Sequence, residues 1–381
     1  MSTFNFLKDC MPSFVPGGKL SRRVWIIVKY KAKGETESKD ISEEISKYFL
    51  SLSWNDNLTD SVDDITLTLE DRSQLWLENW FPERGSMLDI TIHRYNWTNL
   101  SEGEMSLSLG EFEIDEIETD GMPSTVNIKA VSVIGNSTLR GVKRNRTWEN
   151  ISVWKCASDI CQENNIELFW DCEENPNLDH VEQADQSDLE FLQKICKDSG
   201  RSLKVTPSKI IIIDDCKYEQ KEAAVVCIKP GCFFNAKDSN LNQNKQYSVV
   251  DLLTAYTLKS KIRNIYYKCH VKYQKGKDKA VIEGEFVAPD KNDGQVLQVS
   301  EQVENTAEAE RLAKKKLREA NKDEVTGNIA TIGDFRLSAG LTVIMQGFGK
   351  FDGKYIITKA SHSISSTYTT GIEIRRCLNG Y

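Results

Sequence analysis

Hydrophobic and polar residues alternate with a period of two along much of the first third of the chain. The clearest stretches are 50–54, 65–69, 88–93, 105–109, 112–114 and 126–130. Because successive side chains of a β-strand point to opposite faces, this pattern predicts antiparallel strands with one face in solvent. Short strands at this spacing are typical of a β-sandwich or β-barrel. Residues 73–80 interrupt the alternation, and we expect a short helix there that ends before Pro82.

The pattern changes to a helical period between residues 138 and 206. After Trp148, apolar residues recur at helical spacing, which predicts a helix whose buried face carries Ile151, Trp154, Ala157 and Cys161. A second helix follows a polar lead-in. Ser187 and Glu190 have the spacing of a capping box, and Gly200 ends the helix. A strand with Leu203 and Val205 comes directly after it.

The alternating pattern returns after residue 206. It predicts strands at 210–213, 223–228, 249–257, 262–273 and 280–287, and closing strands at 341–346, 354–359 and 371–375. One long amphipathic helix is expected over 306–321, with acidic residues early and basic residues late, as the helix dipole favours. Gly347, Gly349 and Gly353 mark turns between the closing strands.

These patterns predict a mainly β protein with an α/β insert. A chain of 381 residues is too long for one ordinary core. We expect an N-terminal arm at 1–20, a first β domain at 21–137, a small α/β insert at 138–206, and a second β domain at 207–381 that contains the helix near 306–321.

The charge balance narrows the possible partners. The chain has 49 basic and 57 acidic residues and a formal net charge of −8, without a basic face visible in the sequence. We therefore expect no specific nucleic-acid binding. The first residues lack the basic and apolar regions of a signal peptide. Since the longest apolar runs hold only four residues, we expect a soluble protein without membrane insertion.

No residue pattern predicts a catalytic or metal site. The ten cysteines form no C-x-x-C pair and the four histidines are scattered singly, so we expect reduced cysteines and no metal. The acids Glu111, Glu113 and Asp115 share the solvent face of one strand, which favours a solvated surface over a catalytic pair. The glycine-rich 347–350 segment opens no helix, so it is not expected to cradle a phosphate. The basic 140–146 segment is expected to make an inter-domain or inter-subunit contact.

Two sets of residues carry a resemblance to a known family. The first lies in the insert and comprises Gln183, Ser187, Asp188, Phe191, Leu192 and Gly200. The second lies near the end and comprises Gly340, Gly347, Gly349, Gly353 and Tyr355. In order and spacing, both sets resemble the phage late control gene D family. Its members are baseplate hub proteins of contractile tails, related to the hub part of type VI secretion spike proteins.

The resemblance implies a structural protein rather than an enzyme, without catalytic residues or cofactors. It implies two tube-type antiparallel β-barrel domains that flank the α/β insert. Three such subunits would form a pseudo-sixfold ring that joins the tail tube to the central spike. The implied partners are the tail tube protein, the central spike protein, baseplate wedge proteins and the tape measure protein. The implied location is the baseplate of a virion or tail-like particle assembled in the bacterial cytoplasm.

Two other functions remain open at this point. A cell-wall hydrolase at the tail tip would use acids such as Asp115 or Asp171. A carbohydrate-binding protein would use exposed tryptophans among Trp76, Trp80, Trp97 and Trp170.

The resemblance also gives the polar lead-in of the second helix a role. Gln183, Ser187 and Asp188 are expected to fix how the insert is capped and oriented. We expect either Ser187→Ala or Asp188→Ala to lower the free energy of unfolding by about 1 kcal/mol, the usual effect of losing helix-terminal support.

Overall fold

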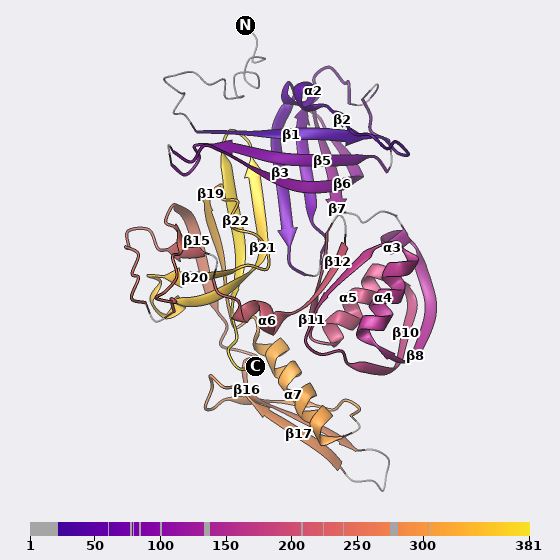
Figure 1. The fold of residues 1–381 in the computed structure, drawn as a ribbon, viewed down its shortest axis with the longest axis vertical. Helices are drawn as coiled ribbons and strands as arrows, with labels where there is room; N and C mark the ends of the chain where they lie inside the picture. Colours follow the sequence, from indigo (N-terminus) through magenta and orange to yellow (C-terminus); the bar gives the residue numbers. More distant parts are fainter. Residues whose placement is uncertain are drawn as a thin grey trace.

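The structure is a computed structural model. It describes residues 22–381 apart from 60, 77, 79, 84, 100, 133–137, 207–208, 224, 239, 275–280 and 304. The arm expected at residues 1–20 therefore lies outside the described residues. The chain is mainly β, as the alternating pattern predicted, and its strands form one large sheet and three small ones (Figure 1).

The first β region has the strict alternation of burial that the sequence predicted. Along β4 and β7 every second residue is buried, and all of these except Ser132 are apolar (Ile65, Leu67, Leu69, Val126, Ile128 and Ala130). Its elements are β1 (Arg23–Lys31), β2 (Lys39–Asp40), α2 (Ser42–Ser46), β3 (Phe49–Asn57), β4 (Asp64–Glu70), β5 (Met87–Tyr95), β6 (Glu104–Asp120) and β7 (Thr125–Ser132).

The described residues of 73–80 form turns instead of the short helix that we expected. Asp71 explains the difference, because its carboxylate accepts the backbone N–H of Trp76 at 3.3 Å and holds a turn at this point. Trp76 is buried there and meets the ring of Trp80 edge to face, 5.4 Å between centroids. Burial of the indole therefore sets the local conformation in place of helical periodicity.

The second β region closes the chain. It consists of β13 (Val225–Ile228), β14 (Ser248–Val250), β15 (Leu253–Ser260), β19 (Val325–Ile332), β20 (Thr342–Gln346), the 3₁₀ turn η1 (Gly349–Phe351), β21 (Gly353–Ile364) and β22 (Tyr368–Arg376). Its core is a cluster that includes Val225, Val343, Tyr355, Ile357 and Ile374. The short strand β13 lies parallel to both β14 and β20, whereas β15, β19, β22 and β21 follow one another antiparallel.

One long strand joins the two β regions. The first half of β21 pairs with β20, and its second half, from Lys359 to Ile364, pairs antiparallel with β3 of the first region. The two regions consequently share a single 14-stranded sheet. Among the described strands no closed barrel is found, so the two separate barrels that the resemblance implied are not seen within one chain.

The described part of the α/β insert consists of four helices and two small sheets. Strands β8 (Lys143–Ser152) and β10 (Asn177–Ser187) form one sheet, and β11 (Arg201–Val205), β12 (Lys209–Asp214) and β9 (Glu167–Asp171) form the other. The helices are α3 (Thr138–Gly141), α4 (Val153–Glu163), α5 (Asp188–Asp198) and the short α6 (Asp215–Gln220). Because β12 pairs with both β9 and β11, the small sheet continues past residue 206.

The buried face of α4 differs from the one expected. Ser152 caps the helix, so the buried positions run from Val153 at i, i+3, i+4, i+7 and i+8 and end at Cys161. Ala157 and Cys161 are buried as expected, but Trp154 points outward with 43% of its surface exposed. The sequence pattern placed Ile151 and Trp154 on the buried face because it was counted from Ile151. Ile151 belongs to β8, and the helix begins only at Val153.

A third body lies at the far end of the molecule from β1 and α2 (Figure 1). It consists of β16 (Tyr266–Gln274), β17 (Val281–Val287), β18 (Gln295–Val299) and α7 (Thr306–Asn321). The long helix has the bounds that we predicted and buries Ala309, Ala313 and Leu317 on the small sheet. Gly284 of β17 allows this close approach, since a Cβ there would lie 2.5 Å from the backbone of Ala309. None of the described helices is long and apolar enough to cross a membrane.

Gly333 provides a test of how tightly the β regions are packed. A Cβ at this position would lie 1.9 Å from the ring of Tyr368, which is buried. We expect Gly333→Ala to lower the free energy of unfolding by about 3 kcal/mol, the upper range for overpacking a core. Chemical denaturation of the full chain would measure it.

Gly121→Ala is the matched control. It lies in the turn between β6 and β7, has open space where a Cβ would go, and has no positive φ. Its stability should change by less than about 0.5 kcal/mol. A similar, small effect in both variants would contradict tight packing at Gly333.

Candidate functional site

The insert signature residues gather around one buried carboxylate. Asp188, the first residue of α5, is fully buried. Its Oδ1 pairs with the guanidinium of Arg146 from β8 and accepts the side-chain amide of Gln183 at 3.0 Å. Its Oδ2 accepts the amide of Asn164 at 3.0 Å. Four segments of the insert are therefore fixed to one another through a single side chain.

Aromatic stacking extends this cluster into the core. The guanidinium of Arg146 lies 5.1 Å from the ring centroid of Trp148, which in turn stacks on Phe191 at 5.1 Å with an interplanar angle of 10°. Phe191 and the neighbouring Leu192 are fully buried on α5. The cation on an aromatic face thus lies between the polar cluster and the apolar core.

The capping box predicted for α5 is confirmed. The Ser187 hydroxyl accepts the N–H of Glu190 at 3.3 Å, and the Glu190 carboxylate accepts the N–H of Ser187 at 2.9 Å. These hydrogen bonds hold the pKa of Glu190 below its usual value. At the other end, Gly200 follows the helix with a φ of +72°, the left-handed conformation that terminates helices.

The basic 140–146 segment makes ionic contacts within the insert. Arg144 and Arg146 both donate to Glu163 of α4, at 2.8 and 2.5 Å, and Lys143 pairs with Asp185 at 3.2 Å. These are contacts within the insert. For these three residues the acidic partners lie on neighbouring elements of the insert, so the inter-domain contact is not found among the described residues, and the inter-subunit contact stays a prediction.

The C-terminal signature residues form a second, separate group. Gly340, Gly347, Gly349 and Gly353 all have positive φ values and make the turns on either side of β20. Tyr355 is fully buried on β21, donates its hydroxyl to the carbonyl of Phe351 at 2.8 Å, and accepts from Arg376 at 3.1 Å. In this chain the two signature groups thus make a helix cap, a buried ion pair and turns.

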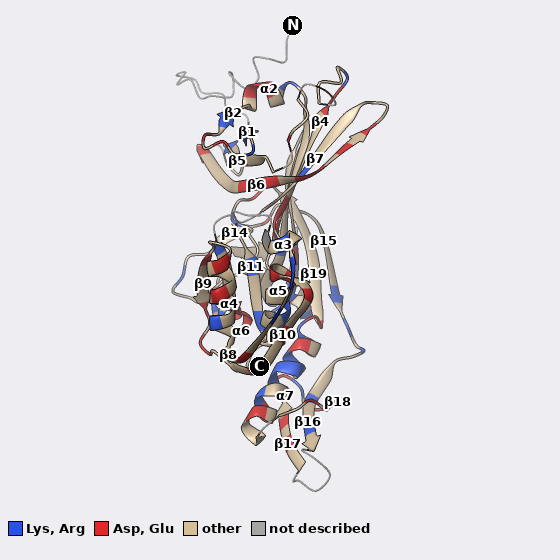
Figure 2. Cartoon of the chain, turned by 90° about the vertical axis from the view of Figure 1, so that its right-hand side faces the viewer, with Lys and Arg blue, Asp and Glu red and all other residues tan. Residues whose placement is uncertain are grey.

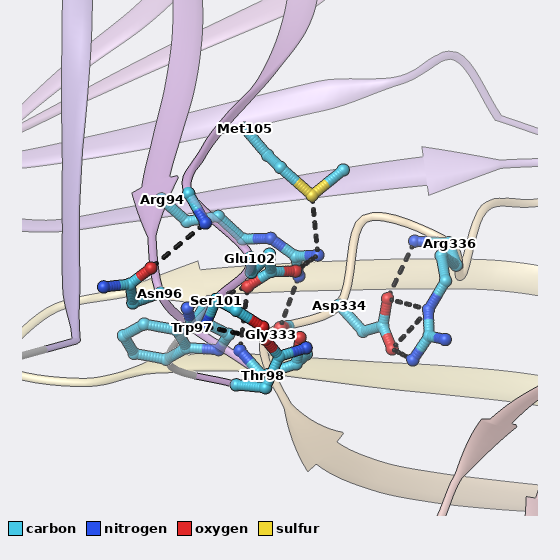
Figure 3. Close-up of polar contacts among 12 residues, drawn as sticks. Arg94, Asn96, Trp97, Thr98, Ser101, Glu102, Met105, Gly333, Asp334 and Arg336 are labelled. Carbon is cyan, nitrogen blue, oxygen red and sulfur yellow. Dashed lines mark hydrogen bonds and ion pairs between the residues drawn. The ribbon is translucent and has the colours of Figure 1, made fainter. Parts of the chain in front are cut away.

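A junction between the two β regions was not predicted from the sequence. Arg94 of β5 is 2% exposed and donates to the backbone carbonyl of Gly333, 239 residues further along the chain, at 3.2 Å (Figure 3). Its Nη2 also pairs with Glu102 at 2.7 Å. The second oxygen of Glu102 accepts the backbone N–H groups of Trp97 and Thr98, at 2.8 and 2.9 Å.

The charges of this junction are mutually compensated. Burial opposes ionisation of Glu102, but the hydrogen bonds from Thr98 and the charge of Arg94 outweigh it and hold the pKa of Glu102 below its usual value. The guanidinium of Arg94 also lies 4.5 Å from the ring centroid of Phe335. A buried arginine with both an ionic and an aromatic partner fixes the relative position of the two segments.

A buried histidine lies directly on the β3–β21 pairing. His362 pairs with Trp54 across the two strands, and their rings stack at 4.8 Å. Its Nε2 donates to the carbonyl of Leu337 at 3.2 Å, and its Nδ1 lies 2.8 Å from the Tyr368 hydroxyl. Burial lowers the pKa of His362 to about 4, so the ring is neutral at pH 7.

A lysine from the insert binds the β regions. Lys204 of β11 forms an ion pair with Asp56 of β3, and Asp63 lies 3.8 Å away. The other oxygen of Asp56 accepts the N–H of Ala339 at 2.8 Å. Burial raises the pKa of Asp63 to about 7, against the charge of Lys204 and with the help of the Asp56 carboxylate.

Glu219 of α6 connects three bodies of the molecule. Its carboxylate, 3% exposed, pairs with Arg375 of β22 and with Arg318 of α7 at 2.7 Å, and it accepts the N–H of Leu378 at 2.9 Å. Asp215, one turn earlier, pairs with Arg375 at 3.2 Å. The short helix α6 therefore joins the insert, the large sheet and the α7 body through ionic contacts.

Burial and ion pairing change the pKa of several other reactive groups. Burial raises the pKa of Cys156 and Cys196 to about 12, so these thiols are protonated at pH 7. Hydrogen bonding to Lys217 lowers the pKa of Asp171, which makes it a poor general acid. Within the described residues no three His, Cys, Asp or Glu side chains form a group that could hold a metal ion.

Comparison with known proteins relates this chain to phage tails. A family model described as YQBQ-like matches residues 228–375. The chain is 26% identical over 177 residues to the probable baseplate hub protein of Escherichia phage 186 and 27% identical over 183 residues to that of phage P2. Each match covers 46% of this chain but only 43% of the relative.

Solved structures with the same fold are also tail proteins. The 43 kDa tail protein of prophage MuSo2 from Shewanella oneidensis has a TM-score of 0.63 at 12% identity, over 93% of this chain and 98% of that protein. An E. coli component of the type VI secretion system has a TM-score of 0.50 at 11% identity, over 93% of this chain and 78% of that protein. The resemblance to baseplate hub proteins is thus confirmed, and the fold is that of phage tail proteins.

The Asp188 cluster predicts unequal effects for two neighbouring substitutions. Ser187→Ala should lower the free energy of unfolding by about 1 kcal/mol, since it removes one cap. Asp188→Ala should lower it by about 3 kcal/mol, because Arg146 would lose its buried anion and keep only the more exposed Glu163, and the amides of Gln183 and Asn164 would lose their acceptor. This revises the equal effects expected from the sequence. Urea denaturation would measure both.

Asp185→Asn serves as the control for this pair. Asp185 and its partner Lys143 are both exposed, and Asn tolerates the φ of +48° at this position, so loss of the charge should change stability by less than about 0.5 kcal/mol. Equal, small losses for Asp185 and Asp188 would show that the buried cluster does not hold the insert together.

His362 predicts a pH dependence of stability. The pKa of His362 is about 4 in the folded chain and 6.5 without the effect of burial. Between pH 4 and 6.5 the unfolded chain therefore binds a proton that the folded chain does not bind. Falling pH should therefore destabilise the wild type relative to His362→Gln, by on the order of 3 kcal/mol in total between pH 6.5 and 4. Asp63 acts in the opposite direction but is present in both proteins, so it cancels in the difference. A pH-independent difference would contradict a buried neutral imidazole.

Proposed function

We propose that this chain is a structural baseplate hub of a contractile phage tail or tail-derived particle. Three copies form a ring that joins the tail tube to the central spike. The related baseplate hub proteins support the class of particle, and because the matches cover less than half of those relatives, the whole function is proposed here. The single observation that supports a ring is the large sheet shared by the two β regions.

Eight strands of that sheet lie side by side in one series, and each β region contributes four neighbouring strands to it. The first region contributes β6, β7, β4 and β3, and the second contributes β21, β22, β19 and β15. All seven neighbouring pairs are antiparallel. A subunit with two four-stranded halves gives six such units in a trimer. This supports an adaptor between a sixfold tube and a threefold spike.

One face of this eight-stranded run is polar, with Ser, Thr and Asn side chains beside the charged Lys129, Lys359 and Glu373. Ser361 donates to Asn55 at 2.7 Å, and Asn55 donates to Asp64 at 2.8 Å, which links three strands across the boundary of the two regions. Thr68 donates to Asn127 at 2.9 Å on the same side of the sheet. We propose that this face lines the lumen of the ring, where a polar surface without a basic cluster would not bind a passing polyanion.

The two alternative functions receive less support. Of the four tryptophans considered for carbohydrate binding, Trp76 is buried, Trp97 packs on Tyr368 at 5.6 Å, and only Trp80 is among the strongly exposed apolar residues. For a hydrolase, Asp171 is held ionised by Lys217. We therefore propose a non-enzymatic role without a cofactor.

We propose the partners that a hub position requires. These are the tail tube protein, the central spike protein, baseplate wedge proteins and the tape measure protein, in a particle assembled in the bacterial cytoplasm. We also propose that the functional bodies are the shared sheet, the insert up to α6, and the α7 body with its small sheet. The contacts of Glu219 support treating these as one connected subunit.

The ring predicts a defined assembly. Sedimentation and mass measurements at increasing concentration should give a trimer without larger closed species, and electron microscopy of that trimer should show a ring with six similar lobes around its channel. If the trimer forms only in contact with other tail proteins, adding the purified tail tube protein should produce the ring. A chain that stays monomeric under both conditions would contradict the proposal.

A further inference from the structure

We propose that strand β15 of one copy pairs, antiparallel, with the second half of β6 of the next copy, and that opposite charges select this pairing. The proposal rests on the trimeric ring and deepens it, since it assigns the strands and residues that hold neighbouring subunits together. The partner is a second copy of this chain, in a head-to-tail arrangement.

Both strands have a free edge in the described structure. On one side β15 pairs with β19 from Leu253 to Ser260, and no other described strand pairs with its outer edge. On β6, pairing with β5 stops at Glu113, whereas pairing with β7 continues to Asp120. The outer edge of β6 beyond Glu113 therefore also lacks a described strand partner. Open edges of this kind bind further strands readily.

The direction of the strands suits a closed ring. Seven antiparallel pairings separate β6 from β15, so the two strands run in opposite directions within one copy. In a ring with cyclic symmetry every copy has the same orientation relative to the axis. The β6 strand of the next copy is therefore antiparallel to β15. The contact between copies therefore continues the antiparallel order of the strands in the sheet.

The two edges carry opposite charges. The end of β15 and the residues after it are basic and exposed, namely Lys259, Lys261 and Arg263. The free half of β6 is acidic, with Asp115, Glu116, Glu118 and Asp120. Figure 2 shows acidic residues along β6 and basic residues at the lower end of β15. Antiparallel pairing brings the basic end of β15 to Asp115 and Glu116, at the start of the free half.

The acidic edge retains negative charge in the isolated subunit. Lys129 of β7 binds both Glu116 and Glu118, at 3.0 Å each, so one cation is shared by two carboxylates. Asp115 is exposed. A symmetric contact of two β6 edges would bring like charges together and is disfavoured. A symmetric contact of two β15 edges would leave both acidic edges without a partner. The head-to-tail contact satisfies both edges and closes the ring.

Charge reversal tests the pairing. The double variant Lys259→Glu with Lys261→Glu should raise the dissociation constant of the trimer at least about tenfold, because acidic edges would then face each other. Adding Asp115→Lys and Glu116→Lys in the same chain should return it to within about threefold of wild type. Analytical ultracentrifugation of the full chain would measure both, beside the tail tube protein if the ring needs it.

The matched control reverses two exposed lysines elsewhere. Lys194→Glu with Lys237→Glu changes the net charge equally, on α5 and on the loop before β14, and should leave the trimer unchanged. Thermal melting should be similar for all variants, since these side chains are exposed. As an independent readout, we would place Lys259→Cys and Glu116→Cys in a background with Cys10→Ser and Cys232→Ser. Oxidation should then give disulfide-linked dimers and trimers, and no larger cross-linked species.

The outcomes separate the pairing from the proposed function. The β15–β6 contact is overturned if the wild type forms a trimer but the charge reversal does not weaken it, or the charge swap does not restore it, and the cysteine variant gives no cross-linked trimer. These results would leave the proposed hub function in place. A wild-type chain that forms no trimer even with the tail tube protein overturns both.

Discussion

The pairing of β3 with the second half of β21 is the contact on which the rest of the structure depends. It joins residues about 300 positions apart and turns two β regions into one sheet. The contacts around it are buried and directional: the His362 ring on Trp54, and the Arg94 guanidinium on the carbonyl of Gly333. Since a one-residue slip would exchange the two faces of the sheet, these contacts also fix which face is polar.

Ionic contacts hold the smaller bodies on this frame. Lys204 joins the insert to β3, and Glu219 joins α6 to both β22 and α7. Buried pairs of this kind add little net stability, because desolvation offsets much of their attraction. Their value is in specificity, since each pair is satisfied in only one relative placement of the two bodies. Apolar packing provides the cohesion of each body, and the ion pairs select how the bodies meet.

The sequence predicted local structure well and long-range structure poorly. The alternation in β4 and β7, the capping box at Ser187 and the bounds of α7 depend on near neighbours, and each was found as expected. The 73–80 helix was wrong because the Asp71 turn and the burial of Trp76 set the local conformation, and the face of Trp154 was wrong because the helix begins later than the pattern assumed. The partners of Arg94 and Arg146 lie far away in sequence, so neither junction could be inferred from spacing. Spacing alone predicted the cap at Ser187 and the turns at Gly347, Gly349 and Gly353, whereas the ion pair of Asp188 and the hydrogen bonds of Tyr355 were found only in the structure.

The Ser361–Asn55–Asp64 chain of hydrogen bonds has a consequence for transport through the proposed ring. Donors and acceptors that already bind one another within the sheet have little left to offer a molecule that slides past. Each new contact would have to break an existing one, so the wall binds weakly at every position and no position acts as a trap. Such a surface would give low friction to a cargo of any sequence, which is what a conduit needs and a receptor must avoid.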